Sequence, residues 1–327
     1  MLAIFDTAKA SANLGDRIIM EAVNEELNAL LGNKKIVLGN RWTIARVATH
    51  RPMNIYERCL VRFASRKIVG GTNLLNGDLD KVRQWRFSDS QIELLSGSIL
   101  LGCGWRSYEG AIEPTTAEIW NNILCKNAIH SVRDEYTKNK LREIGIVNVV
   151  NTSCPTMWSL NEWHCRQIPK KKSDRVVFTL TDYNRDVELD REMIGLLRMH
   201  YSSVFFWPQS LRDIPYFEGL GIEGVLQLEP TVKAFDAFLE SEKVDYVGTR
   251  LHAAIRALQF KRRALVIAVD NRGAEIGNDT HLHYVQRGEM DLLEKWIGTD
   301  SETKIEIPLE AIETWRNQFR ICNINAD

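Results

Sequence analysis

The sequence Val244-Asp-Tyr-Val-Gly-Thr-Arg-Leu-His252, which runs on into Ala253-Ala-Ile-Arg-Ala-Leu258, decides the fold. The apolar run at 244–247 is typical of a buried strand, and the glycine and threonine at 248 and 249 mark the loop that ends it. Residues 250–260 then follow the period of a helix, for which Thr249 is the predicted N-cap. A strand, a short polar loop and a helix in this order predict one repeat of a parallel α/β sheet.

The same alternation of strand and helix extends in both directions from this stretch. On the N-terminal side, strands are predicted at 2–5, 36–38, 67–69, 98–101, 128–132 and 147–150, and helices at 16–31 and 134–144. After a lysine-rich stretch at 169–175, strands are predicted at 176–180, 203–206, 224–226 and 264–269, and helices at 190–199 and 230–239. Such alternation implies parallel sheets with helices on both faces. We therefore predict two Rossmann-like, doubly wound α/β domains, 1–168 and 169–327, that face a cleft, with an amphipathic tail helix at 309–319 packing back.

Composition excludes several classes of function. The 327 residues include 42 Lys and Arg against 43 Asp and Glu, so no general field steers the chain onto nucleic acid or an anionic bilayer. The six cysteines form no CxxC pair and no zinc spacing, which favours reduced thiols in a reducing compartment. The N-terminus resembles a strand and not a signal peptide, and no apolar run approaches the ~20 residues that span a bilayer. We expect a cytoplasmic protein that meets the inner face of the membrane only through its acceptor.

Residues that follow the predicted strands carry the chemistry, because ligands of open parallel sheets bind beyond the carboxyl ends of the strands. Arg250 and His252 fall in the first turn of the helix predicted at 250–260, where free N–H groups and the helix dipole favour an anion. The alternative is that Arg250 forms a structural ion pair and that His252 is a hydrogen-bonded histidine at a helix start. The two interpretations are about equally supported by the sequence.

A second signal is Ser131-Val-Arg-Asp134, at the end of the strand predicted at 128–132. Asp134 is interpreted as the N-cap of the next helix. Arg133 carries a planar guanidinium suited to carboxylate or phosphate, and its strand is expected to end at the cleft between the domains.

Taken in order, Asn13-x-Gly15-Asp16, Gly70-Gly-Thr-Asn73, Ser131-Val-Arg-Asp134 and Thr249-Arg-Leu-His252 resemble the motifs of polysaccharide pyruvyl transferases. The resemblance runs from the first strand to about Gly273, and only the last two motifs are specific, since glycine motifs occur in many α/β proteins. It implies a glycosyltransferase-B-like fold, and it implies that Arg133, Arg250, Leu251 and His252 hold phosphoenolpyruvate. The chain departs from the pattern in two places. Cys154-Pro155 stands where many members have Asp-Pro, and Arg272 stands where many have a lysine.

From this resemblance we expect transfer of the enolpyruvyl group of phosphoenolpyruvate to a saccharide, free or lipid-linked, in exopolysaccharide or capsule biosynthesis. His252 is the expected general acid/base, and Arg133 and Arg250 the expected anion-binding catalytic residues. The expected donor-binding residues are Arg133, Gly248, Thr249, Arg250, Leu251, His252 and Arg272. On the acceptor side we name Asn13, Asp16, Asn73, Arg106, Asp182 and Arg185, whose capping and turn roles are equally good explanations. No cofactor is expected beyond the donor substrate. No metal is expected either, because His281 and His283 lack a third ligand nearby.

Two alternatives stay open at this point. A nucleotide-sugar glycosyltransferase on the same fold shares the anion-binding helix end, and thermal stabilisation by phosphoenolpyruvate but not by nucleotide sugars separates the two enzymes. A non-catalytic saccharide-binding protein is the third hypothesis. It would tolerate loss of Arg133, Arg250 and His252, all of which are present.

Overall fold

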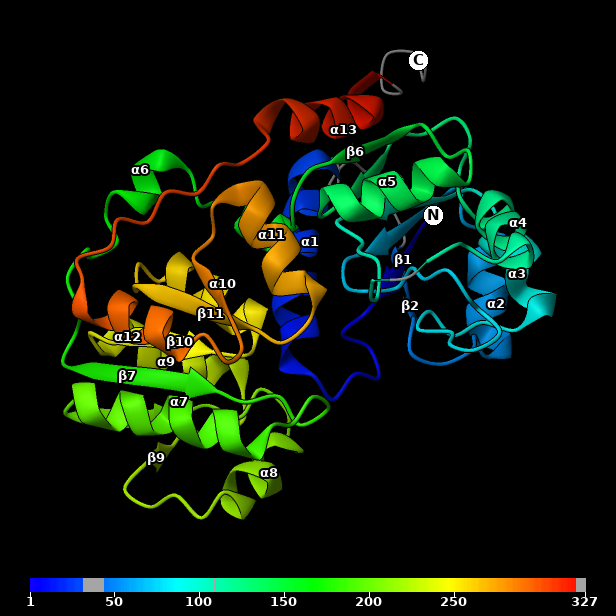
Figure 1. The fold of residues 1–327 in the computed structure, drawn as a ribbon. Helices are drawn as coiled ribbons and strands as arrows, with labels where there is room; N and C mark the ends of the chain where they lie inside the picture. Colours follow the sequence, from blue (N-terminus) through cyan, green and yellow to red (C-terminus); the bar gives the residue numbers. More distant parts are fainter. Residues whose placement is uncertain (32–43, 109, 322–327) are drawn as a thin grey trace. The chain divides into compact units, whose positions relative to one another are not determined.

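The computed structural model describes residues 1–31, 44–108 and 110–321, so the strand predicted at 36–38 lies outside the described residues. Contacts divide the chain into two compact units. Unit 1 comprises Met1–Ser11, Ile19–Pro155 and Pro308–Asp327, and unit 2 comprises Ala12–Ile18 and Thr156–Ile307. Each unit is built on its own parallel sheet (Figure 1).

The sheet of unit 1 is parallel and has the strand order β2-β1-β3-β4. Its strands are β1 (Leu2–Asp6), β2 (Ile44–Ala48), β3 (Arg66–Gly70) and β4 (Ser98–Leu101). A parallel pair, β5 (His130–Val132) and β6 (Val149–Asn151), continues this layer through a bridge between Cys103 and Val132. Because the chain winds from β1 to β2 on one side and to β3 on the other, the sheet is doubly wound.

Helices of unit 1 cover the two faces of this sheet. One face buries Phe5, Val69 and Leu100 in a core shared with four helices, which are α2 (Ile55–Arg62), α3 (Ile92–Leu95), α4 (Pro114–Ile123) and α5 (Glu135–Glu143). The other face receives α1 (Leu14–Leu31) and α13 (Leu309–Ile321). A short 3-10 helix, η2 (Asp89–Gln91), precedes α3.

The sheet of unit 2 is parallel throughout, in the order β12-β11-β10-β7-β8-β9. Its strands are β7 (Arg175–Thr179), β8 (Ser203–Phe206), β9 (Leu226–Gln227), β10 (Asp245–Gly248), β11 (Ala264–Ala268) and β12 (Tyr284–Gln286). From β7 the chain winds outward to β8 and β9, and it then returns to β10 on the other side of β7. The order of strands therefore reverses between β7 and β10, which is where open α/β sheets bind ligands.

Helices of unit 2 also cover both faces of the sheet. The core on one face, around Phe178, Phe206 and Leu265, includes side chains of α7 (Val187–His200), α8 (Asp213–Gly219) and α12 (Met290–Gly298). On the other face, Phe235 of α9 (Val232–Ser241) stacks on Trp207 at 3.9 Å between ring centroids. The remaining helices are α10 (Leu251–Gln259), α11 (Asn271–Thr280), α6 (Glu162–Cys165) and the 3-10 turn η3 (Pro155–Met157).

The units differ from the predicted ranges 1–168 and 169–327 at two places. Residues 156–168 group with unit 2, because Gln259 of α10 donates to the Thr156 carbonyl and His164 bonds the Leu258 carbonyl. The tail groups with unit 1, because the indole of Trp315 donates to the Leu100 carbonyl at 3.1 Å and Arg316 pairs with Glu26. The tail helix packs back as predicted, and it does so on the first sheet.

Within the described part of the chain, no helix combines the length and the apolar character needed to cross a membrane.

Candidate active site

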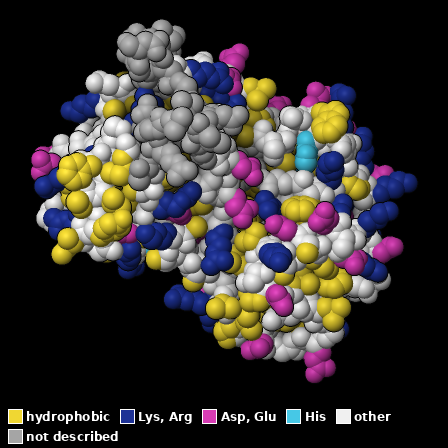
Figure 2. Space-filling view, turned by 180° about the vertical axis from the view of Figure 1, so that it is seen from behind, with side chains coloured by type: hydrophobic (Ala, Val, Ile, Leu, Met, Phe, Trp, Pro, Cys, Tyr) yellow, Lys and Arg dark blue, Asp and Glu magenta, His cyan; other side chains and the backbone are white. Residues whose placement is uncertain are grey.

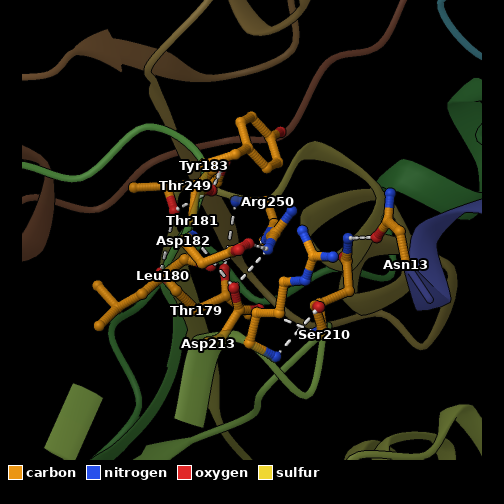
Figure 3. Close-up of polar contacts among 12 residues, drawn as sticks. Asn13, Thr179, Leu180, Thr181, Asp182, Tyr183, Ser210, Asp213, Thr249 and Arg250 are labelled. Atoms are coloured by element: carbon orange, nitrogen blue, oxygen red, sulfur yellow. Dashed lines mark hydrogen bonds and ion pairs between the residues drawn. The ribbon is translucent and has the colours of Figure 1, made fainter. Parts of the chain in front are cut away.

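The loops after β7 and β10 meet at the point where the strand order of unit 2 reverses (Figure 3). Gly248 ends β10 so close to β7 that a Cβ there would lie 2.5 Å from the Thr179 hydroxyl and 2.6 Å from the Thr179 nitrogen. The Thr249 hydroxyl bonds the Thr181 hydroxyl at 2.8 Å. Thr249 is therefore not the N-cap that the sequence predicted. The cap position belongs to Arg250, whose side chain makes no capping hydrogen bond, and the helix starts at Leu251.

Arg250 is held by several hydrogen bonds from its guanidinium group. Its Nε donates to the Leu180 carbonyl at 2.9 Å, and its Nη2 contacts Asp182 at 3.2 Å and Asp213. Its guanidinium carbon lies 5.0 Å from the centroid of the Tyr183 ring. Only 3% of Arg250 is exposed. The structure therefore shows the ion pair that was the alternative interpretation of this arginine, and two carboxylates balance its charge.

Asp213, the N-terminal residue of α8, also accepts hydrogen bonds from the backbone of Asp182 and Ser210. Burial raises the pKa of the Asp213 carboxyl, and the charge and hydrogen bond of Arg250 oppose that rise. Arg250 thus offsets part of the cost of burying the Asp213 carboxylate, and the pair fixes the loop after β7 against the start of α10.

His252 lies in the first turn of α10 and is buried. It lines a pocket at the carboxyl end of the sheet. The pocket is lined by Asn13, Tyr183, Gln209, Thr249, Arg250, Leu251, His252, residues 266–270, Arg272 and Gly273. The start of α10 lines this pocket and has no side-chain cap, so the positive end of the helix dipole lies at the pocket.

Gln209 also lines the pocket, although no role was predicted for it from the sequence. Its Nε2 donates to Asn13 Oδ1 at 2.8 Å, and its carbonyl accepts from the Leu14 N–H at 2.9 Å. These bonds tie the start of α1 to unit 2, and Gly15 permits them, because a Cβ there would lie 2.8 Å from Gln209 Nε2. The position of Gln209 after β8 was the only signal that pointed to it.

Arg272, in the first turn of α11, approaches the same pocket. Its Nε donates to both oxygens of Asp270, the N-cap of α11, at 2.9 Å, and its Nη2 contacts the Tyr183 hydroxyl. Burial lowers the pKa of Arg272, but Tyr183 and Asp270 outweigh burial and raise it. The guanidinium therefore stays charged beside the pocket.

Arg133 has a comparable setting in unit 1. Its Nε contacts Asp134 at 3.3 Å and its Nη2 donates to Asn73, and only 1% of the residue is exposed. A side chain at position 104 would collide with this guanidinium, so Gly104 is needed for the packing. Asp134 caps α5 by accepting from the Thr137 N–H at 2.7 Å, which confirms its predicted capping role.

The other predicted residues divide between these settings and the surface. Asn13 lines the pocket of unit 2, and Asp182 holds Arg250 beside it. Arg185 donates to the Asp182 carbonyl and lies over the Tyr216 ring. Asp16 is buried in the first turn of α1. Arg106 is exposed and lines a separate hollow of unit 1 with Asp78 and Lys81.

Six predicted residues therefore line one pocket of unit 2, and these are Asn13, Thr249, Arg250, Leu251, His252 and Arg272. Asn73 and Arg133 lie together in unit 1. The predicted convergence of Arg133 with Arg250 and His252 joins the two units and stays a prediction. Among the described residues, no group of three or more His, Cys, Asp or Glu side chains is arranged to hold a metal ion.

The two parallel sheets and a pocket where the strand order reverses define a glycosyltransferase-B-like α/β protein. Two structures of the Methanocaldococcus jannaschii UDP-GlcNAc 2-epimerase are similar in fold. The complex with UDP-GlcNAc and UDP has a TM-score of 0.56 at 10% identity, and the second structure has 0.54 at 11%; each comparison covers 99% of both chains. No curated protein sequence is significantly similar to the chain. The family model for polysaccharide pyruvyl transferase matches residues 13–271, and the chain belongs to this family.

Proposed function

We propose that the protein transfers the enolpyruvyl group of phosphoenolpyruvate to a saccharide and forms a pyruvate ketal during the biosynthesis of a surface polysaccharide, such as a capsule or exopolysaccharide. Membership of the family supports transfer of a pyruvyl group. The choice of donor rests on one observation. The start of α10 has no side-chain cap, and it lines the pocket together with His252 of its first turn.

An anionic group of the donor fits the start of α10 better than it fits Arg250. Helix N-termini bind carboxylate and phosphate through free N–H groups and the dipole. Arg250 is already paired with Asp182 and Asp213, so its role is to fix the geometry of the α10 start. Arg272 lies beside the pocket as a second cation and is paired with the carboxylate of Asp270.

The chemistry begins with a proton delivered to the methylene carbon of the donor, which creates an oxocarbenium-like centre at C2. A saccharide hydroxyl adds to C2 and loses its proton. Phosphate then leaves with the electrons of its C–O bond, and a second hydroxyl adds to C2, loses its proton and closes the cyclic ketal. His252 is the proposed general acid and base for these proton transfers, because a histidine titrates near neutral pH.

The direct test is phosphate release from phosphoenolpyruvate with a panel of methyl hexosides as acceptors, followed by the mass of the product. A sugar product heavier by the enolpyruvyl unit is expected. UDP-sugars serve as the competing donors. Transfer of a hexose from a UDP-sugar, with no phosphate release from phosphoenolpyruvate, would show that the proposal is wrong.

The test of His252 is the variant His252→Gln, for which we expect a loss of turnover of about 10²–10⁴-fold with phosphoenolpyruvate binding retained. The control is His281→Gln, since His281 is exposed at the C-terminal end of α11 and pairs with the exposed Glu306. Equal turnover in the two variants would remove His252 from the mechanism.

A further inference from the structure

Helix α2 exposes an unusually apolar face. The exposed fractions are 84% for Ile55, 71% for Tyr56 and 72% for Phe63, the residue that caps the helix. Cys59 is also exposed. We call these four residues the α2 face. Figure 1 shows α2 at the right. Figure 2 is the view from behind, so this side is at the left, and hydrophobic side chains gather at that edge.

The α2 face points outward because the opposite side of the helix is firmly held. At 100° per residue, Ile55, Cys59, Phe63 and Tyr56 fall within about a third of a turn. The other side buries Val61 and Glu57.

Glu57 receives hydrogen bonds from Arg51 at 2.7 and 2.8 Å and from Lys9 at 3.0 Å, and it closes a capping box with Asn54. Burial raises the pKa of Glu57, but the bonds from Arg51 and Lys9 outweigh it and lower that pKa to about 2. Glu57 therefore anchors the helix as a carboxylate, and rotation of the apolar face into the core would break this network.

The segment that carries the α2 face is strongly basic, although the whole chain has a net charge of −1. Residues 44–67 contain six basic residues and a single acid, Glu57, which Arg51 and Lys9 neutralise. Within α2, Arg62 is exposed and Arg58 is partly exposed. The neighbouring helix α3 contacts α2 and adds one exposed acid, Glu93. The local charge thus stays positive.

An apolar and aromatic face beside arginines matches the interface of an anionic bilayer. Aromatic side chains favour the boundary between headgroups and acyl chains, and arginines near a surface of anionic lipid are attracted to it. A second copy of the chain is a poorer occupant. Stable interfaces bury about 800 Å² on each partner, whereas α2 is only about 12 Å long. A symmetric pairing would also bring Arg58 and Arg62 close to their own counterparts.

We propose that the α2 face docks on a bilayer that contains anionic phospholipid, with Ile55, Tyr56 and Phe63 in the interface and Arg58 and Arg62 at the headgroups. This proposal is independent of the proposed function, since it uses no residue of the pocket. It places the protein directly on a membrane surface, in addition to any contact made through a lipid-linked acceptor.

The test is cosedimentation of the full chain with vesicles of phosphatidylcholine, with or without phosphatidylglycerol. Wild-type protein is expected to bind the anionic vesicles, and binding is expected to weaken as salt screens the arginines. The double variant Arg58→Gln/Arg62→Gln is expected to lose roughly tenfold or more in binding, given the contribution of each arginine near an anionic surface. The variant Ile55→Ser/Phe63→Ser is expected to lose binding at low salt as well.

Matched controls use exposed residues elsewhere in unit 1. Val147→Ser removes an exposed apolar side chain, and Lys126→Gln/Arg142→Gln removes two exposed cations. Controls that lose as much binding as the α2 variants would overturn the proposal, as would equal binding to vesicles without phosphatidylglycerol. A wild-type dimer that Ile55→Ser/Phe63→Ser dissociates would also overturn it, because the face would then be an interface between copies.

Discussion

At the scale of single residues, the cost of burying Arg250 explains the arrangement around the pocket. A guanidinium that is almost fully buried must find hydrogen bonds and opposite charge, and Leu180, Asp182 and Asp213 supply both. Removal of the arginine leaves two carboxylates without their cation. The pairing thus makes Arg250 a residue on which the folding of unit 2 depends, apart from any contact with substrate.

We predict that Arg250→Met destabilises unit 2 by about 3–5 kcal/mol at neutral pH, because breaking a buried pair leaves an uncompensated charge. The loss should shrink as pH falls, since burial already raises the pKa of Asp213 and a protonated Asp213 no longer needs its partner. The measurement is hydrogen exchange of β7 and β10 in increasing urea, which reports the unfolding of this unit. Arg166→Met, which breaks an exposed pair with Glu162, is the control. Equal effects of the two substitutions would contradict the prediction.

His130 gives unit 1 a dependence of stability on pH. Burial lowers the pKa of its imidazole from 6.5 to about 4, and its ring bonds the Leu100 N–H and the Cys125 carbonyl. The unfolded chain takes up a proton as pH falls through 6.5, whereas the folded protein resists it until about 4. Stability is therefore complete above pH 6.5 and decreases between 6.5 and 4.

At pH ~5 this linkage corresponds to a loss of about 2 kcal/mol relative to pH ~7.5. The variant His130→Gln should remove that part of the pH dependence, and His281→Gln, at an exposed site, should keep it. Urea unfolding at the two pH values measures the difference. The same pH dependence in wild type and His130→Gln would exclude this histidine as its source.

The residues near the pocket were easier to predict from the sequence than the hydrogen bonds that they make. Asp134 was recognised as a cap, because a side-chain cap needs only local sequence. Thr249 was assigned the wrong role, because its hydroxyl bonds Thr181, a residue on the loop after another strand. No role was predicted for Gln209 for the same reason. Its partner Asn13 is 196 residues away in the sequence, and no local pattern records such a pair.

At the scale of elements, the β10–α10 repeat depends on the close approach of β10 to β7, which only a glycine at position 248 permits. Gly248 was predicted to bind donor, and the structure supplies a packing reason for it, since any Cβ would overlap the Thr179 backbone of β7. The strand, the tight loop and the helix start are therefore positioned by β7, which is the central neighbour of β10.

Two glycine substitutions test this packing and are expected to have opposite signs. Gly248→Ala should destabilise unit 2 by at least about 1–3 kcal/mol, as overpacking does, because backbone atoms must move. Gly195→Ala should stabilise it by about 0.5–1 kcal/mol, because Gly195 lies inside α7 with open space around its Cα and alanine is the better helix former. Hydrogen exchange of β7 in urea again measures both. A neutral Gly248→Ala would show that β7 and β10 tolerate a wider spacing.

Long periodic elements were predictable and short polar ones were not. The strands at 98–101 and 203–206 and the helices α1 and α13 were anticipated, since their apolar residues repeat clearly. Strand β2 was missed because Arg46 interrupts its short apolar run, and β12 because it has only three residues. Their pairing with neighbouring strands, which the sequence does not display, makes them strands.

At the scale of the whole molecule, the chain passes between the two units four times, at residues 11, 18, 155 and 307. Two parallel-sheet units were predictable from the repeated strand–helix pattern. The crossings were not, because they follow from single anchoring contacts such as Gln209 with Leu14, or Trp315 with Leu100. Arg133 and Arg250, the two arginines predicted from the sequence to bind the donor, belong to different units.

That division yields the last prediction, which concerns the participation of both units in donor binding. If phosphoenolpyruvate contacts Arg133 as well as the start of α10, its addition should slow amide exchange in two stretches, 130–137 and 249–255. The reason is that each stretch contains a helix start, whose first N–H groups exchange readily until an anion or a neighbour protects them. Hydrogen exchange of the full chain, with phosphoenolpyruvate and separately with inorganic phosphate, measures both stretches at once, and α2 provides an internal reference outside the pocket. Slower exchange in 249–255 alone would mean that unit 2 holds the donor without Arg133. No change in either stretch, under conditions where phosphate release from phosphoenolpyruvate is observed, would place the donor elsewhere on the protein.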